Sequence, residues 1–333
     1  MTLEVKYPIE PMEAKSVDAL PEGGGWQYEP KWDGFRCVAF RDGKTVRLQS
    51  KAGKPLERYF PDVVEAVAGL GASKCVLDGE IVIQVGRRLS FDQLLLRVHP
   101  AASRVRALVA AHRARLEVFD LLADERGRSL LERPLSERRE RLERFAERFM
   151  DDPDSIALSA ATTSVATARK WLAGGKGDLD GVMAKRLDCP YRAGERDGMV
   201  KVKRQRTADC VVGGFRYASK GGKVGSLLLG LYDEEGLLNH VGFTSSMAAG
   251  ERAEMTRRLE RLVEPPGFTG RSPGGPSRWS TERSTEWEPL RPELVVEVGY
   301  DHVSGGRFRH GTRFLRWRPD KDPRQCTAAQ LAR

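Results

Sequence analysis

The sequence predicts an α+β protein with two domains. Before about residue 203, short apolar segments of strand character alternate with longer segments whose apolar residues have helical spacing. Beyond residue 207 the chain carries several short strands and one helix, a pattern typical of a small Greek-key barrel. Its 333 residues suffice for two domains, each with a core of its own.

Basic charge is spread along the chain. The sequence has 56 Lys and Arg against 47 Asp and Glu, a net charge of +9, which suits a protein that binds a polyanion. The five cysteines include no Cys-x-x-Cys pair, which argues against a zinc knuckle or a disulfide framework and indicates a reducing compartment. No apolar run reaches membrane-spanning length and no signal peptide is recognisable, so we expect a cytoplasmic protein without a membrane partner.

Each element of the first domain follows from a local pattern. Residues 26–30 and 37–40 are strand-like, and a turn at residues 41–45 makes residues 38–48 a β-hairpin. Ser90 has capping-box spacing and should begin a helix. The remaining expected elements are helices at residues 60–70, 90–97, 103–113, 134–150 and 165–172, and strands at residues 116–122, 181–185 and 199–203.

Residues 74–83 combine strand character with acidic residues. We expect two apolar strand segments there, broken by Asp78-Gly79-Glu80. A buried strand has no structural need for two carboxylates at its centre, because each costs several kcal/mol when it is unpaired. The pair therefore indicates function.

The chain changes character at residues 204–207. Beyond them we expect one helix at residues 249–262 and strands at residues 210–215, 227–232, 240–244 and 294–300. Residues 265–287 are rich in Gly, Pro, Ser and Arg and predict a long exposed loop. For a small basic barrel of this kind, the OB-fold is the natural candidate.

The interpretation of the chain centres on Lys31-Trp32-Asp33-Gly34-Phe35-Arg36, a lysine at a strand end followed by a tight turn. A lysine amine attacks only when it is deprotonated, which desolvation or neighbouring positive charge favours. Taken alone, the string is more typical of a surface lysine before a turn. Its interpretation depends on the residues downstream.

Charged and aromatic residues in strand-like surroundings resemble, in order and spacing, the nucleotidyltransferase motifs of ATP-dependent DNA ligases. The matching segments are Lys31 to Arg36, Asp78-Gly79-Glu80, Phe119-Asp120, Asp180-Gly181-Val182-Met183-Ala184-Lys185, Lys201-Val202-Lys203 and Arg316-Trp317-Arg318-Pro319-Asp320-Lys321. Alone, each is typical of a turn, a core strand or a solvated face, whereas six in order are specific. The resemblance runs from about residue 8 to the end and is strongest to the small two-domain bacterial type, ligase C.

This resemblance implies a fold and a division of the chain. Residues 1–203 would form a nucleotidyltransferase (adenylation) domain of antiparallel sheets with flanking helices. Residues 204–207 would be a hinge, and residues 208–333 an OB-fold domain that binds nucleic acid.

It also implies roles in a reaction with ATP. Lys31 would attack the α-phosphate, expel pyrophosphate and carry AMP. The other implied roles are an α-phosphate clamp for Lys201 and Lys203, ribose binding for Glu80, adenine stacking for Phe119, acceptance from the adenine amino group for Glu29, contact with the sugar and then the nick phosphate for Arg36, nucleotide binding for Lys185 and Arg318, a catalytic place for Asp33, and orientation of pyrophosphate for Asp320 and Lys321.

A divalent metal and a DNA substrate complete the implied activity. Asp180 would help hold Mg²⁺ or Mn²⁺, ions that favour carboxylates and phosphate oxygens. The substrate would be nicked duplex DNA, with a repair polymerase or end-binding proteins as partners. We expect a monomer that associates with the nucleoid.

Two residues depart from the family pattern, which usually has Glu where Asp180 stands and often Trp where Met199 stands. An RNA ligase or an RNA-capping guanylyltransferase would use the same lysine chemistry. A catalytically silent nucleic-acid-binding module is a third reading, but the intact charged set argues against it. An NAD-dependent ligase should carry a four-cysteine zinc site, which this sequence lacks.

Overall fold

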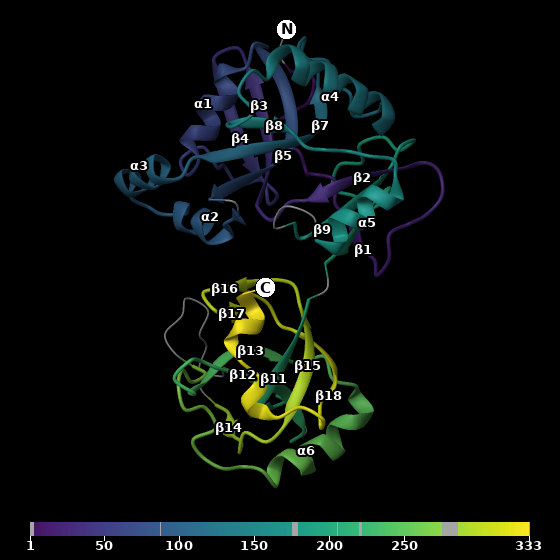
Figure 1. Cartoon of the computed structure of the whole chain (residues 1–333). Coiled ribbons are helices and arrows are strands. Elements are labelled where there is room, and N and C mark those ends of the chain that lie inside the picture. The colour runs from purple at the N-terminus through teal and green to yellow at the C-terminus, as the bar shows by residue number, and fades with distance from the viewer. Residues whose placement is uncertain are drawn as a thin grey trace. The chain divides into compact units, whose positions relative to one another are not determined.

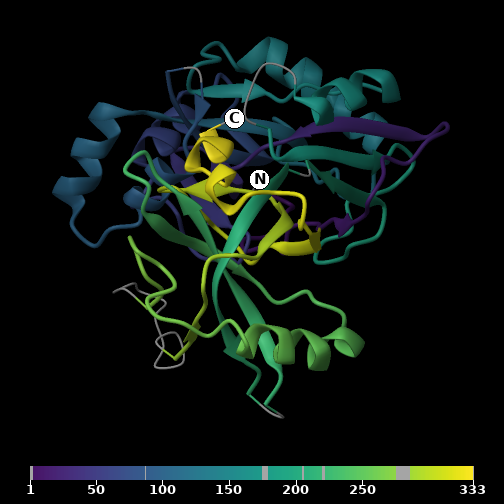
Figure 2. The same cartoon turned by 60° about the horizontal axis from the view of Figure 1, so that its bottom comes forward.

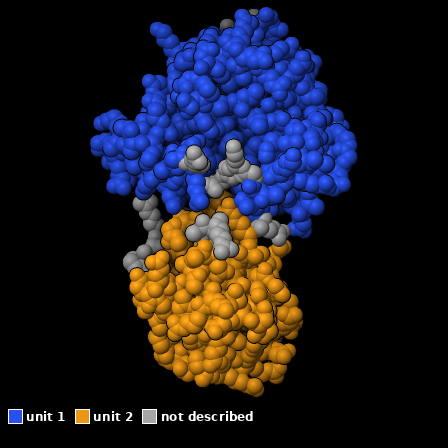
Figure 3. Space-filling model, viewed as in Figure 1, with its two compact units in different colours: residues 1–204 blue, residues 205–333 orange. Residues whose placement is uncertain are grey.

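The computed structural model describes residues 3–86, 88–174, 179–204, 206–219, 222–274 and 286–332. The chain divides into two compact units, unit 1 with residues 1–204 and unit 2 with residues 205–333 (Figure 3). In the described residues, no helix is long and apolar enough to cross a membrane.

The first sheet of unit 1 has the strand order β4-β3-β5-β7-β8, with β6 paired to β5 (Figure 1). Its pairs are antiparallel except β7 with β8, which is parallel. The strands are β3 (Phe35–Asp42), β4 (Thr45–Ser50), β5 (Lys74–Val85), β6 (Arg88–Leu89), β7 (Ala114–Ala123) and β8 (Ile156–Leu158).

Both faces of this sheet are buried, and successive residues of β3 point to opposite faces. Cys37 and Ala39 pack with residues of α1 and α4, whereas Val38 and Phe40 pack on the opposite side with the N-terminal segment and with β10. The helices are α1 (Pro61–Gly69), α2 (Phe91–Arg97), α3 (Ala102–Ala111) and α4 (Leu135–Phe149).

The expected break at Asp78-Gly79-Glu80 is wrong, because β5 runs through these residues without interruption. The irregularity lies in the partner strand instead. Asp78 pairs with Asp120 and Gly79 with Val118, which leaves Phe119 as an extra residue of β7. Such a bulge changes the direction of the side chain that it carries.

The second sheet of unit 1 has the order β1-β10-β9-β2. Its strands are β1 (Lys15–Ser16), β2 (Trp26–Lys31), β9 (Gly181–Arg186) and β10 (Met199–Lys203). Helix α5 (Val165–Ala173) packs against one face of β2 and β9. The pair β1–β10 is parallel, so both sheets are antiparallel with one short parallel pair each.

Unit 2 is built on a sheet of order β13-β12-β11-β15-β18, with β14 paired to β11. An isolated bridge joins Thr244, at the end of β13, to Thr312, just before β18. The bridge places the end of β13 beside the residue that precedes β18. The strands of the sheet are β11 (Arg206–Tyr217), β12 (Val224–Tyr232), β13 (Leu238–Thr244), β14 (Glu288–Pro289), β15 (Val295–Tyr300) and β18 (Arg313–Trp317). The strands β16 (Val303–Ser304) and β17 (Arg307–Phe308) form a separate antiparallel pair.

The helix expected at residues 249–262 is shorter than predicted. It consists of a 3₁₀ turn, Ala249–Glu251, and α6 (Arg252–Glu260), which packs against β12 (Figure 2, light green). Of the predicted loop at residues 265–287, residues 275–285 lie outside the described part of the chain. The α+β class predicted from the sequence is confirmed.

Candidate active site

A pocket lies between the two sheets of unit 1. Glu29, Lys31, Arg36, Glu80, Phe119, Lys185 and Lys201, all singled out from the sequence, line it. The other lining residues are Pro11, Met12, Glu13, Ala14, Pro30, Trp32, Lys51, Met183 and Met199.

Strand periodicity explains why these side chains converge. In β2, Glu29 and Lys31 line the pocket, whereas Tyr28 packs with α5 on the opposite face. Met183 of β9 lies opposite Glu29, and Lys201 of β10 lies opposite Met183. Because directly opposed residues share a face of a sheet, three neighbouring strands contribute to one wall.

Close packing fixes the turn that follows Lys31. A Cβ atom at Gly34 would overlap the backbone of β5, so only glycine lets the chain pass there. The indole Nε1 of Trp32 donates to Ser159 Oγ at 2.9 Å. Asp33 lies in this turn and is half-buried.

Lys31 ends β2 beside Asp180, and Nζ forms an ion pair with Asp180 Oδ2. One backbone hydrogen bond joins the two residues, because the Asp180 N–H donates to the Lys31 carbonyl at 3.0 Å. A second fixes Asp180 to the residue after β10, because the Asp180 carbonyl accepts from the Arg204 N–H at 3.0 Å. Gly181 follows with a φ of 154°, and a Cβ there would overlap the backbone of β10. The position next to Asp180 therefore requires glycine.

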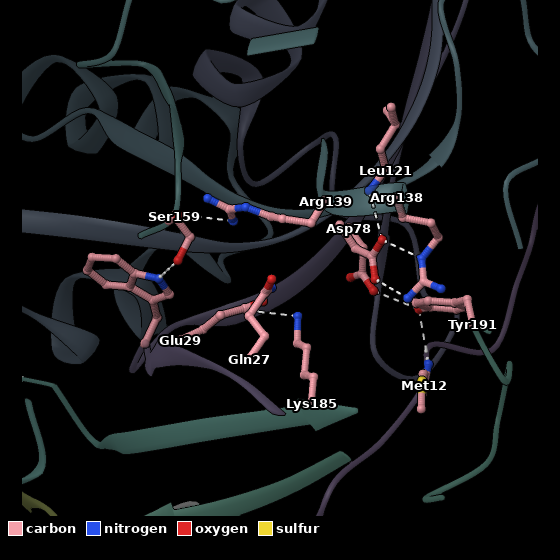
Figure 4. A network of polar contacts seen from close by, with 12 residues as sticks. Met12, Gln27, Glu29, Asp78, Leu121, Arg138, Arg139, Ser159, Lys185 and Tyr191 are labelled. Atoms are coloured by element: carbon pink, nitrogen blue, oxygen red, sulfur yellow. Dashed lines mark hydrogen bonds and ion pairs between the residues drawn. The ribbon is translucent and has the colours of Figure 1, made fainter. Parts of the chain in front are cut away.

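Arg36 is held by a buried carboxylate. Its Nε and one terminal nitrogen each donate to Asp78 at 2.6 Å, the bidentate geometry that gives the strongest guanidinium pairs. The Tyr191 hydroxyl also donates to Asp78, at 2.6 Å, and accepts from the backbone N–H of Met12 at 3.0 Å (Figure 4). The chain of contacts links the pocket rim to the centre of the first sheet.

Two cations lie over the ring of Phe119. The guanidinium carbon of Arg36 is 4.7 Å from the ring centroid, and Lys185 Nζ is 4.5 Å from it, both within cation–π range. Lys185 also forms an ion pair of 2.7 Å with Glu29. The bulge in β7 thus presents an aromatic face among charged groups.

Burial, together with neighbouring charge, shifts pKa values in the pocket, among them those of Glu80 and Lys201. Burial raises the pKa of Glu80 to about 7, although the positive charges of Arg36 and Lys31 oppose the shift. The pKa of Lys201 is lowered by burial and then by the charges of Lys31 and Lys203. Lys203 lies two residues further along β10, on the same face as Lys201.

One buried carboxylate could contribute to a metal site. Among the described residues, no group of three or more His, Cys, Asp or Glu side chains is arranged to hold a metal ion. Mg²⁺ is commonly bound by one or two carboxylates, with water and substrate phosphates as its other ligands. Asp180, 5% exposed beside Lys31, fits a site that a bound triphosphate would complete.

The predicted residues of unit 2 gather around Asp209 in β11. Arg318 pairs with Asp209 at 2.8 Å and with Asp320 at 2.9 Å, while Lys321 Nζ is 3.8 Å from Asp209. The hydrogen bond from Arg318 lowers the pKa of Asp320 to about 2. Arg318 is therefore fixed between two carboxylates, Asp209 and Asp320. Lys321 is held less tightly, by its longer ion pair, and its side chain is only partly buried.

Two family models cover most of the chain. Residues 11–203 match the ATP dependent DNA ligase domain, and residues 220–321 match the ATP dependent DNA ligase C terminal region. The chain belongs to the ATP-dependent DNA ligase family. The family predicted from the six motifs is thereby confirmed.

Known ligases resemble this ligase over almost its whole length. It is 47% identical to DNA ligase C1 of Mycolicibacterium smegmatis, over 99% of this chain and 96% of that protein. Its identity to DNA ligase C of Mycobacterium tuberculosis is 44%, over 100% and 96% of the two chains. The solved ligase domain of M. tuberculosis LigD matches with a TM-score of 0.50 and 28% identity, over 96% of this chain and 98% of that one.

Sequence reasoning missed three residues that support the pocket of this ligase. Met12 and Tyr191 belong to irregular segments, and no local pattern marks either of them. Gln27 had one signal, since it stands two residues before Glu29 in the same strand and so shares its face.

Proposed function

We propose that this ligase joins a 5′-phosphate to a 3′-hydroxyl at nicks in duplex DNA, through a lysyl-AMP and then a DNA-adenylate. The observation that carries the proposal is the convergence of Lys31, Arg36, Glu80 and Lys201 on one pocket. Burying such groups together costs free energy unless a charged ligand interacts with them. A nucleoside triphosphate has the matching charge.

In the first step, the Nζ lone pair of Lys31 attacks the α-phosphorus of ATP, and the bond to pyrophosphate breaks as the P–N bond forms. Lys201 and Lys203 stabilise the charge that develops on the α-phosphate. AMP then passes to the 5′-phosphate of the nick, and the 3′-hydroxyl displaces it. We count Asp33, in the turn after Lys31, among the catalytic residues together with Lys31, Lys201 and Lys203.

The pocket supplies a contact for each part of the nucleotide. Phe119 stacks on adenine, and Glu29, paired with Lys185, accepts from the adenine amino group. Glu80 accepts from the ribose hydroxyls. Arg36 contacts the sugar and later the nick phosphate, with Asp78 holding its guanidinium in place.

For the metal, we propose Mg²⁺ or Mn²⁺ held by Asp180 and by phosphate oxygens of the substrate. Such an ion would neutralise part of the charge on the triphosphate. Asp180 also contacts Lys31, so the residue that would hold the metal lies next to the nucleophile.

We assign residues 1–203 to an adenylation domain, residues 204–207 to a hinge and residues 208–333 to an OB-fold domain that binds nucleic acid. In the last of these, Arg318, Asp320 and Lys321 would bind and orient the leaving pyrophosphate. Repair synthesis leaves nicks of the kind proposed, so we place the ligase in DNA repair. It would act there as a cytoplasmic, nucleoid-associated monomer, with a repair polymerase or end-binding proteins as partners.

Labelled ATP tests the proposed nucleophile. Lys31→Ala should form no protein–AMP from α-labelled ATP, because the attacking amine is gone, yet it should still close a nick that already carries AMP. Lys44→Ala, which removes an exposed lysine from the turn between β3 and β4, should keep both reactions. Protein–AMP formed by Lys31→Ala would disprove the assignment, and label from GTP but not ATP would favour a guanylyltransferase.

A further inference from the structure

A buried glutamine stands behind the base-binding end of the pocket. Gln27 Nε2 donates to Glu29 Oε1 at 2.8 Å, and Lys185 Nζ pairs with Glu29 Oε2 at 2.7 Å (Figure 4). Gln27 is 5% exposed, Glu29 1% and Lys185 7%. Gln27 itself does not line the pocket, whereas Glu29 and Lys185 do.

These contacts fix the orientation of two groups in the trio of Gln27, Glu29 and Lys185: the Glu29 carboxylate and the Gln27 amide. A carboxylate can only accept, so the amide nitrogen of Gln27, and not its oxygen, must face Glu29. Each oxygen of Glu29 is held by a different donor, which prevents the carboxylate from turning about its last torsion. The strand register supports this arrangement, because Gln27 lies directly opposite Lys185 in the pair β2–β9.

The pocket thus presents an acceptor, Glu29, beside a donor, Lys185. Purines differ at position 6, the position that would face these two groups. Adenine carries an amino donor at position 6, whereas guanine carries an oxygen acceptor at the same position. A fixed Glu29 accepts from the adenine amino group and repels the guanine oxygen. If Glu29 turned aside, the ammonium of Lys185 could donate to that oxygen instead, and the preference for adenine would weaken.

We propose that Gln27 is a positioning residue that sets the preference for ATP by holding Glu29 as an acceptor toward the adenine amino group. This inference rests on the proposed role of Glu29 in adenine binding. Gln27 would act only through Glu29, so its loss should affect substrates that carry the 6-amino group and spare those that lack it.

The test compares two triphosphates on the same variants. Protein–AMP formation from ATP is measured beside adduct formation from purine ribonucleoside triphosphate, which lacks the 6-amino group. In Gln27→Met the side chain keeps its length but cannot donate, and kcat/KM for ATP should fall about tenfold, the typical effect of a lost hydrogen bond to a charged group. The value for the analogue should stay unchanged, and relative use of GTP should rise.

Tyr28→Phe is the matched control. It removes a hydrogen bond of 2.7 Å from the Tyr28 hydroxyl to the Pro21 carbonyl. Tyr28 lies in the same strand as Gln27, but its side chain is on the face toward α5. In this variant, the ratio of kcat/KM for ATP to kcat/KM for the analogue should equal that of the unchanged protein. Gln27→Leu serves as a second apolar variant should Gln27→Met fail to fold, as judged by thermal melting.

Three other outcomes would overturn the inference, and each would identify a different assumption as wrong. Equal losses with ATP and with the analogue in the Gln27 variants would mean that Gln27 is structural. An unchanged protein that uses both substrates equally would mean that Glu29 does not read the amino group. If the unchanged protein forms no adduct with ATP at all, the proposed function itself fails.

Discussion

Glu80 should make the proposed nucleotide pocket sensitive to pH. It lies opposite Arg36 in the pair β3–β5, and burial raises its pKa from an ordinary value of 4.5 to about 7. Because the folded-state pKa is the higher one, Glu80 favours folding fully below pH 4.5 and loses that contribution as pH rises through about 7. Its proposed role in binding ATP has the opposite pH dependence, since the ionised carboxylate is the better acceptor for ribose hydroxyls.

The KM for ATP in Lys31 adenylation should therefore fall as pH rises from 6 to 8. The expected change is about tenfold, because a group with a pKa near 7 is about one-tenth ionised at pH 6 and about nine-tenths ionised at pH 8. Glu80→Gln cannot ionise at this position, so its KM should report only the titration of ATP and of other pocket groups such as Lys201. An identical pH profile for both proteins would exclude any role of the Glu80 charge in ATP binding.

The residues proposed to act on the nucleotide could be predicted from the sequence, whereas the residues that position them could not. Lys31 and Arg36 stand within one short motif, and Glu80 was conspicuous as an acid in an apolar strand. Tyr191 reaches Asp78 across 113 residues of chain, and nothing in its neighbours signals that contact. A supporting side chain is defined by its partner, which only the folded chain reveals.

At the scale of elements, the bulge of β7 is anchored by α4. Asp120, the residue after Phe119, accepts from Arg138 Nε and from one of its terminal nitrogens, both at 2.9 Å. The side chains of Asp120 and Arg138 are 4% and 2% exposed. A buried pair of this kind contributes little in net terms, but the loss of one partner leaves a costly isolated charge.

Arg138→Met should therefore destabilise unit 1 by about 3–5 kcal/mol. Protection of β7 amides against hydrogen exchange, measured in the full chain across a urea series, reports this change locally. Adenylation should weaken as well, because Phe119 loses its fixed neighbour. Arg144→Met on the same helix breaks an exposed pair with Glu140 and should cost at most about 1 kcal/mol. Similar costs for both variants would refute the anchoring role of Arg138.

The helices and most of the longer strands followed from sequence patterns, but β18 and the pairing irregularities did not. Asp-Gly is typical of turns, so the sequence predicted a break in β5 where the structure has none. Asp78 stays in the strand because Arg36 and Tyr191 satisfy its carboxylate there. The three residues of β8 are too few for any period to emerge, and so the parallel pair β7–β8 was not predicted.

At the scale of the molecule, the proposed chemistry draws on both units. Lys31 belongs to unit 1, whereas Lys321 belongs to unit 2. In unit 2, Asp209 forms a loose ion pair with Lys321 and a tight one with Arg318. A lysine with an ion-pair distance of 3.8 Å can leave its carboxylate at little cost. Pyrophosphate leaves only in the first step, so a residue that orients it should matter in that step alone.

Lys321→Ala should therefore slow the adenylation of Lys31 by at least about tenfold, as the loss of one charge-stabilising donor does, while closure of a pre-adenylated nick stays within about twofold of the unchanged rate. Both half-reactions are measured on the same preparation. Lys223→Ala, which removes an exposed lysine elsewhere in unit 2, should leave both steps unchanged. Equal losses in the two steps for Lys321→Ala would show that the lysine supports the fold of unit 2 or its grip on DNA, and its proposed role toward pyrophosphate would have to be abandoned.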